Sequence, residues 1–290
     1  MTGDKSWVES SVTLSESEIQ AFRENGFFVA RGVFWEEEID RLREGYEYVA
    51  DLVAAGGIDA CYLTGAGPEV HIHVQPPQDT DTYDPVQYLR KVQWPSMIHP
   101  AFEEIRNSEK FPALLAPLIG TTLKQYINQI NFKMPGGEIA FPWHQDVRPI
   151  PAFREQETNY VQTIVVVDEA TVENGCLHVV PGSHKLGNHK VKRYVDGQVE
   201  DLVDVTKAVP LEADPGDVVM FTSYTVHGST PNRTDKPRRS YINGFVRAAA
   251  CDVGKWAFMD AVPVPITSDH DYSRIKRLQS SEASVQANQA

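Results

Sequence analysis

The chain has 290 residues, and its 41% hydrophobic and 10% aromatic content is ordinary for a globular protein with a buried core. Its 40 acidic and 27 basic residues give a net charge of −13, which argues against nucleic acid or an anionic membrane as a partner, because both require a positive surface. No uninterrupted apolar run reaches the length of a membrane span, so no membrane partner is expected.

The cysteines and the N-terminal residues indicate the cellular compartment in which the protein is expected. Cys61, Cys176 and Cys251 show no Cys-x-x-Cys spacing, which fits a reducing environment and argues against a disulfide or zinc framework. The first residues lack the charged-then-apolar layout of a signal peptide. These observations predict a cytoplasmic protein.

The N-terminal part carries helix and strand signals. Ser15 and Glu18 form a capping box that predicts the start of a helix, and Gly26 predicts its end. Residues 27–30 predict a strand, and residues 35–55 predict a longer amphipathic helix. A loop with one strand near residues 70–74 is expected next, followed by short helical pieces over residues 86–120, which four prolines interrupt.

From residue 122 onward, short runs rich in β-branched and aromatic residues alternate with turn sequences. This pattern predicts a β-sandwich or jelly roll. Asn174-Gly175, between two apolar runs, predicts a β-hairpin. The predicted strands are residues 123–134, 160–167, 176–180, 208–211, 218–222 and 240–248.

We expect a single domain over residues 1–290, mainly β with flanking α-helices. Residues 1–120 form a mostly helical part packed on the sheets, and residues 121–250 form the jelly-roll core. Residues 251–290 are expected to be irregular and to end in a polar tail.

A candidate metal site begins at His144 and Asp146. Successive side chains of an extended backbone point to opposite faces, so these two project together. One imidazole and one carboxylate are two-thirds of a facial triad for non-heme iron(II), and a second histidine is the usual third ligand. His227 follows a turn and an apolar strand, which is the position expected for that ligand.

Arg238 follows His227 by eleven residues, at the start of a predicted strand. A guanidinium facing the same interior would bind a carboxylate through paired hydrogen bonds. The adjacent Arg239 is a rival, but only one of two neighbours on a strand can face inward, and the spacing favours Arg238. Ser229, two residues past His227, would add a hydroxyl donor on the same side.

Several motifs in this order resemble the phytanoyl-CoA dioxygenase-like family of iron(II)/2-oxoglutarate-dependent dioxygenases, over residues 14 to about 248. The resemblance implies a double-stranded β-helix, or jelly-roll, core of the cupin type. It is carried by residues 22–27, 144–146, 173–177, 180–184, 215–217 and 227–229, together with Asn232 and Arg238.

The resemblance also implies the roles of individual residues. Iron(II) would be held by His144, Asp146 and His227. The cosubstrate 2-oxoglutarate would chelate the metal and pair its far carboxylate with Arg238, assisted by Ser229. Less specific matches to cosubstrate contacts are Asn131, Lys91 and Thr163.

The implied chemistry consumes oxygen and 2-oxoglutarate and releases succinate and carbon dioxide. We expect hydroxylation of an unactivated C–H bond in a small organic substrate, of natural-product or lipid-like type, within secondary metabolism. Desaturation, epoxidation or ring formation remain alternative outcomes of the same site. The Asp146 carboxylate argues against a halogenating enzyme, which needs a small residue there to leave room for chloride.

Aromatic and charged residues near these motifs are candidates to line a substrate pocket, although ordinary core packing explains each of them equally well. They are Trp94, Trp143, Arg148, Tyr224 and Trp256. Two other functions remain open at this level. One is a zinc-dependent cupin-like hydrolase or isomerase, and the other is a non-catalytic protein that kept the fold. The sequence does not indicate the oligomeric state.

Overall fold

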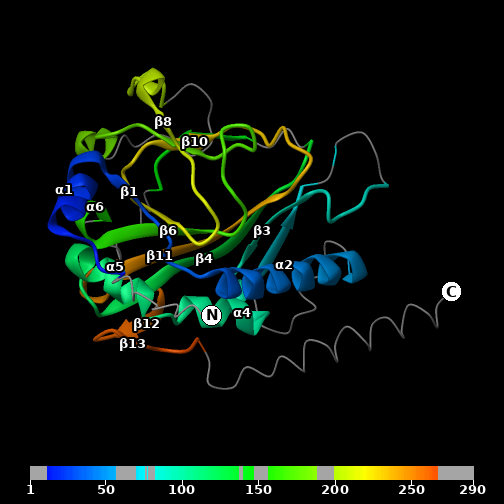
Figure 1. Cartoon of the computed structure of the whole chain (residues 1–290), viewed down its shortest axis with the longest axis horizontal. Coiled ribbons are helices and arrows are strands. Elements are labelled where there is room, and N and C mark those ends of the chain that lie inside the picture. The colour runs from blue at the N-terminus through cyan, green and yellow to red at the C-terminus, as the bar shows by residue number, and fades with distance from the viewer. Residues whose placement is uncertain are drawn as a thin grey trace, which may run out of the picture.

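Two antiparallel sheets form the centre of the fold (Figure 1). The computed structural model describes residues 12–56, 70–75, 77, 82–136, 140–146, 156–187 and 199–266. The small sheet has the strand order β5-β10-β7-β8. Its strands are β5 (Phe141–His144), β7 (Leu177–Val179), β8 (Val209–Leu211) and β10 (His227–Ser229).

The large sheet has nine strands in the described residues, in the order β1-β9-β6-β11-β4-β12-β13, with β3 paired to β4 and β2 paired to β3. Its first strands are β1 (Phe27–Ala30), β2 (His71–Val74), β3 (Leu89–Gln93), β4 (Leu123–Lys133) and β6 (Tyr160–Val166). The others are β9 (Val218–Thr222), β11 (Arg238–Arg247), β12 (Lys255–Met259) and β13 (Val262–Pro263).

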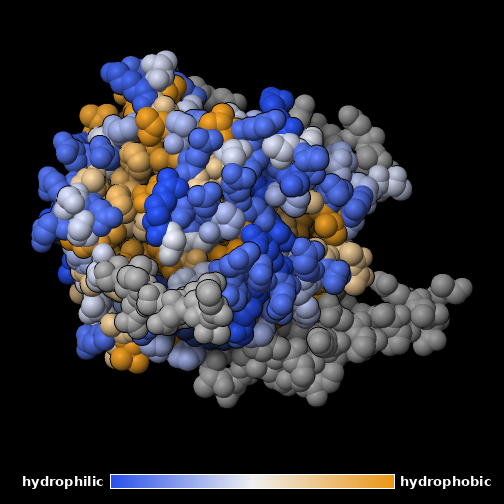
Figure 2. All heavy atoms as spheres, viewed as in Figure 1, coloured by the Kyte–Doolittle hydropathy of each residue, from blue (hydrophilic) through white to orange (hydrophobic). Residues whose placement is uncertain are grey.

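Helices cover one face of the large sheet, as Figure 1 shows for α2, α4 and α5. The outward side of α2 carries exposed hydrophilic side chains, which form a blue region over this helix in the same view (Figure 2). No helix among the described residues is long and apolar enough to span a membrane. The helices are α1 (Glu16–Asn25), α2 (Glu36–Gly56), α4 (Pro100–Arg106), α5 (Lys110–Ile119) and α6 (Gln156–Asn159).

Alternation along the strands separates two cores, as β9 illustrates. Val218 and Met220 pack in the main core together with residues of α2, α4 and α5. Val219 and Phe221 point the other way and pack with residues of the small sheet. The interior between the sheets is therefore lined by alternate residues of each strand, and this is where the functional side chains meet.

The predicted local signals at the N-terminus are confirmed. Ser15 caps α1, the capping box with Glu18 is present, and Gly26 ends the helix at a φ of 82°. Helix α2 and strand β1 lie within one residue of their predicted limits. The six strands predicted between residues 123 and 248 are all present, each within about two residues.

Three predictions about local structure are wrong. Residues 89–93 form a strand rather than a helix, because Leu89 and Val92 are buried and the segment pairs with both β2 and β4. The C-terminal segment is not irregular throughout, because β12 pairs with β4 and with β13.

The third concerns Asn174-Gly175, which forms a turn but not a hairpin. Strand β6 pairs with β9 and β11, whereas β7 pairs with β10 and β8. The turn therefore carries the chain from the large sheet to the small one. The side-chain amide of Asn174 donates to the carbonyl of Glu169, and Gly175 has a φ of 76°.

Candidate metal centre

His144, Asp146 and His227 meet between the two sheets. His144 ends β5, His227 begins β10, and the two residues are partners in the register of these strands. Asp146 lies just beyond β5, and its backbone N–H donates to the carbonyl of Ser223 at 2.9 Å. All three side chains are buried. The two carboxylate oxygens of Asp146 each face one histidine: Oδ1 lies 3.8 Å from Nε2 of His144, and Oδ2 lies 3.8 Å from Nε2 of His227.

Main-chain carbonyls orient both imidazole rings. Nδ1 of His144 lies 2.8 Å from the carbonyl oxygen of Pro142, and Nδ1 of His227 lies 2.9 Å from that of Thr225. A carbonyl can only accept, so each Nδ1 carries the proton and each Nε2 keeps its lone pair for a metal.

The donor set fits iron(II). The three candidate ligand atoms lie within 4.8 Å of one another. Among the described residues, these three side chains form the one cluster of histidine, cysteine or carboxylate groups that could hold a metal. Two imidazole nitrogens and one carboxylate oxygen on one side of the site match the facial triad of non-heme iron(II) oxygenases. Iron would therefore be held by His144, Asp146 and His227, which all line one cavity.

These ligands line a cavity of about 330 Å³ between the sheets. Arg238, Ser229, Asn131 and Lys91 also line it, so four of the five residues predicted to contact the cosubstrate share one cavity with the triad. Its wall is completed by Gln93, Ile127, Gln129, Phe141, Gln162, Ile164, Leu177, Phe221, Ser240 and Ile242.

Arg238 carries a positive charge into the cavity without an ion-pair partner among the described residues. Its Nε is buried and has no hydrogen-bond partner. Burial lowers the pKa of the guanidinium. The adjacent Arg239 points the opposite way and is paired with Asp168 and Glu47. A buried guanidinium without a partner is costly, so the site fits a ligand that brings its own carboxylate.

Thr163 does not line the cavity, and that part of the prediction is not supported. Its hydroxyl donates to the carbonyl of Asn243 at 2.9 Å. Its neighbours Gln162 and Ile164 occupy the cavity wall instead, because adjacent residues of β6 face opposite sides of the sheet.

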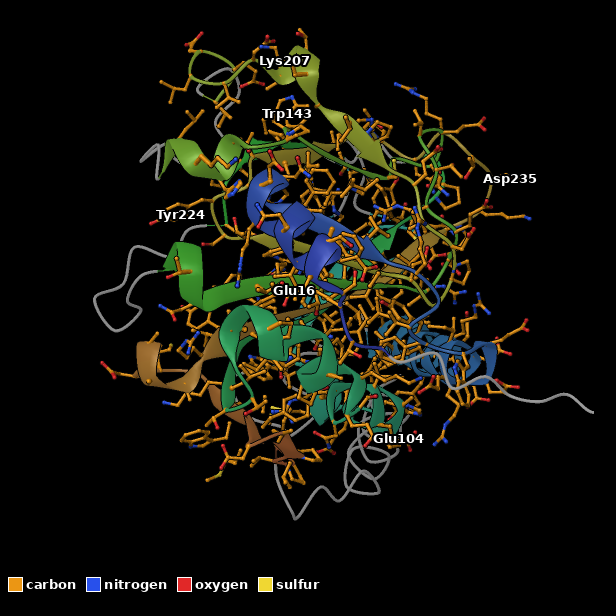
Figure 3. All side chains as sticks on the ribbon, turned by 60° about the vertical axis from the view of Figure 1, so that its left-hand side comes forward. Glu16, Glu104, Trp143, Lys207, Tyr224 and Asp235 are labelled. Carbon is orange, nitrogen blue, oxygen red and sulfur yellow. The ribbon has the colours of Figure 1, made fainter. Side chains whose placement is uncertain are left out.

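The aromatic candidates for the substrate pocket also lie elsewhere. Trp143 faces away from the cavity and packs beside Val180 and Val226, in the small-sheet part of the molecule (Figure 3). Trp94 packs against the main core.

Neither Trp256 nor Tyr224 lines the cavity. The Trp256 side chain is 42% exposed on β12. The carbonyl of Tyr224 accepts a hydrogen bond from Gln145, and the residue does not line the cavity. Arg148, the last candidate, lies outside the described residues.

Several cavity residues were not identified from the sequence. Gln129 lies two positions before Asn131 on β4, and period-two alternation places both on one face, so the prediction of Asn131 also indicates Gln129. Lys133, two positions after Asn131, lies on the same face of β4 but does not line the cavity. No comparable pattern in the sequence indicates that Phe141 or Gln162 faces the cavity.

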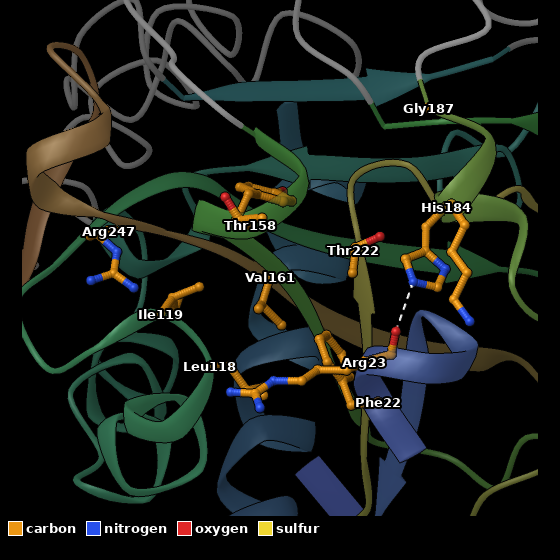
Figure 4. Close-up of a pocket in the computed structure, with 12 residues that line it drawn as sticks. Phe22, Arg23, Leu118, Ile119, Thr158, Val161, His184, Gly187, Thr222 and Arg247 are labelled. Atoms are coloured by element: carbon orange, nitrogen blue, oxygen red, sulfur yellow. Dashed lines mark hydrogen bonds between the residues drawn. The ribbon is translucent and has the colours of Figure 1, made fainter. Parts of the chain in front are cut away.

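A second cavity, of about 570 Å³, lies on the other face of the large sheet (Figure 4). Val161 and Thr222 line it, and these residues alternate with Gln162 and Phe221 of the metal cavity. Arg23 from α1 and Arg247 from β11 also line it. It contains none of the three candidate metal ligands, so it is separate from the metal centre.

Comparison with known proteins agrees with this geometry. The family model "Phytanoyl-CoA dioxygenase (PhyH)" matches residues 22–240. Methylphosphonate hydroxylase of Gimesia maris is 28% identical, over 86% of this chain and 87% of the relative. The 2-aminoethylphosphonate dioxygenase of an uncultured bacterium is 34% identical over 51% of this chain, and the match spans 55% of that relative, about half its length.

Solved structures share the fold. The crystal structure of EctD from S. alaskensis with bound Fe superposes with a TM-score of 0.64 at 19% identity, covering 90% of this chain and 88% of that one. The triad, the unpaired arginine and the family match point to one conclusion. The chain belongs to the phytanoyl-CoA dioxygenase (PhyH) family and is an enzyme that uses iron(II), 2-oxoglutarate and oxygen.

Proposed function

We propose that this enzyme hydroxylates an unactivated C–H bond of a small, polar organic substrate, with succinate and carbon dioxide as coproducts. One observation carries the proposal: the His144–Asp146–His227 triad and the unpaired guanidinium of Arg238 line the same cavity. The triad would bind a metal that activates oxygen, and the Arg238 guanidinium would bind the free carboxylate of a cosubstrate.

The residues divide the cavity into two ends. Arg238 and Ser229 would bind the far carboxylate of 2-oxoglutarate, and the triad would hold the metal that its 2-oxo acid end chelates. When bound, iron(II) would supply the activation of oxygen. Apolar side chains in the lining, including Ile164, Leu177 and Phe221, would limit the access of water to the reacting atoms.

The size and polarity of the cavity support a small polar substrate. Its volume of about 330 Å³ is at the lower end for small-molecule sites. Gln93, Gln129 and Gln162 add carboxamide groups from three strands, and Asp146 is the one carboxylate in the described lining. Arg238 and Lys91 are cations there, so a substrate with an anionic group is favoured.

The relatives provide two small anionic substrates to test. Methylphosphonate and 2-aminoethylphosphonate are named in two of them, and both molecules combine a short carbon chain with an anionic head group. We propose small organic phosphonates as the first substrate class, with the C–H bond beside phosphorus as the position oxidised.

The test has two stages. Anaerobic protein mixed with iron(II) and 2-oxoglutarate should develop a visible charge-transfer band, which His144→Ala abolishes. Absence of this band in correctly folded protein would contradict the proposal. A phosphonate panel is then scored by succinate release and by substrate mass. Gain of one oxygen atom indicates hydroxylation, and loss of two hydrogens would indicate desaturation instead.

A further inference from the structure

Lys133 is a buried lysine at the Arg238 end of the cavity. It closes β4 and is the register partner of Arg238 on β11. The side chain is 2% exposed. Lysine is seldom buried to this extent unless its charge has partners.

Three oxygen acceptors surround Nζ of Lys133. Nζ lies 2.8 Å from Oγ of Ser229 and 3.0 Å from the carbonyl oxygen of Gly175, and it also donates to the carbonyl of Thr230. An ammonium group has three N–H donors, whereas the neutral amine has two. Only the charged form can therefore use all three acceptors at once, and in that form no donor is left for direct contact with a ligand.

The contact with Ser229 has a direction. Because Lys133 donates to the Ser229 oxygen, the hydroxyl proton of Ser229 remains available for another acceptor. Ser229 and Arg238 both line the metal cavity. A carboxylate placed between them would receive hydrogen bonds from both.

The charges around Lys133 lack a counterion among the described residues. Burial, together with the nearby guanidinium groups of Arg238 and Arg90, lowers its pKa to about 6 against a smaller opposing effect of Cys176. No carboxylate contributes. Arg90 lies over the ring of Phe141, 5.6 Å from its centre, and its own pKa is lowered to about 10 by burial. Three cationic side chains thus converge where an anion is expected.

We infer that Lys133 is a positioning residue of the cosubstrate site, which holds the Ser229 hydroxyl toward the carboxylate bound by Arg238 and takes up one proton when that carboxylate binds. This role rests on the proposed use of 2-oxoglutarate, and Lys133 would act through Ser229 without contacting the cosubstrate itself. The proton comes from solvent and is released again when the site empties.

The sign of the pH dependence follows from this coupling. Without ligand, Lys133 is largely neutral above pH of about 6. A bound carboxylate raises the pKa again, because an opposite charge favours the ammonium form. Binding above this pH therefore requires proton uptake, and affinity for 2-oxoglutarate should fall with rising pH by up to about tenfold per unit.

Titration calorimetry of anaerobic, iron-loaded protein with 2-oxoglutarate measures both affinity and proton uptake, the latter from buffers of different ionisation enthalpy. Lys133→Met should weaken 2-oxoglutarate by about tenfold or more, abolish the proton uptake and leave iron affinity unchanged. Ser229→Ala should weaken binding but keep the uptake, because Lys133 remains.

Lys124→Met is the matched control. Lys124 lies on the same strand, and its Nζ donates to the carbonyl of Cys251, away from the cavity. Lys124→Met should leave both the affinity for 2-oxoglutarate and the proton uptake unchanged. The inference would be overturned if Lys133→Met bound 2-oxoglutarate with the affinity and the proton uptake of the wild type. It would also be overturned if the wild type showed no net proton uptake on binding between pH 6.5 and 8.5, a result that does not depend on the folding of Lys133→Met. Failure of the wild type to bind 2-oxoglutarate at all would instead refute the proposed function.

Discussion

His144 and His227 are register partners on β5 and β10, and their ring centroids lie 4.2 Å apart. The pairing of two short strands therefore builds half of the metal site, and Asp146 completes it from the segment just after β5. Each imidazole is oriented by a carbonyl two residues before it in the chain, so the fold itself sets the direction of both Nε2 atoms.

Iron should stabilise the fold through this site. At an iron(II) concentration about 100 times its Kd, we expect the anaerobic melting temperature to rise by about 5 °C, because metal binds the native state and not the unfolded chain. A chelator should reverse the shift. Differential scanning calorimetry checks this, and His227→Ala should show no rise; an equal rise in that variant would place the iron elsewhere.

Arg238 and Arg239 form a matched pair for testing the cosubstrate site. Arg238→Ala should weaken 2-oxoglutarate by at least about 30-fold while iron still binds, because a buried charge pair with the carboxylate is lost. Arg239→Ala should lower the free energy of unfolding but spare 2-oxoglutarate, since its partners are Asp168 and Glu47. Titration of the charge-transfer band measures the affinity, and the reverse ranking of the two variants would contradict the assignment.

Gly175 is required for two separate reasons. Its φ is 76°, and an added Cβ would lie 2.2 Å from the carbonyl oxygen of Thr230 and 2.8 Å from Nζ of Lys133. Gly175→Ala should therefore lower the free energy of unfolding by about 3 kcal/mol or more, combining backbone strain and overpacking.

Gly182 separates these two effects. It has a φ of 73°, but nothing lies within 4 Å of an added Cβ. Gly182→Ala should cost only the backbone part, about 1–2 kcal/mol. Urea denaturation of both variants gives the comparison, and equal losses would show that the close approach of the added Cβ to Thr230 and Lys133 is unimportant.

Gln162 and Thr163 test which face of β6 meets the substrate. Gln162→Leu should raise the KM of the phosphonate that supports succinate release by about tenfold, because a hydrogen-bonding group in the cavity is lost. Thr163→Val removes a hydroxyl that bonds to the carbonyl of Asn243, so it should alter stability and not KM. Steady-state kinetics decides, and an effect of Thr163→Val on KM alone would reverse the assignment of the two faces.

Period-two alternation explains which parts of the site were predictable. The sequence indicates Asn131 on β4, and the same face also carries Gln129 and Lys133. On β6 the sequence indicates Thr163, whereas its neighbour Gln162 lines the cavity. A one-residue error exchanges the faces of a strand, and the run Tyr160–Val166 is buried at nearly every position, so burial gives no clue to the orientation.

The sequence by itself determined the features that depend on neighbouring residues: the capped helix α1, the turn at Asn174-Gly175, and the His144 and Asp146 pair on one side of an extended segment. Motif order added His227 and Arg238. Only the tertiary structure decided that β3 and β12 are strands and that β6 and β7 belong to different sheets. It also decided the role of Lys133, whose ammonium group reaches Ser229, 96 residues away in the chain. Such contacts depend on strand register and burial, which no local pattern encodes.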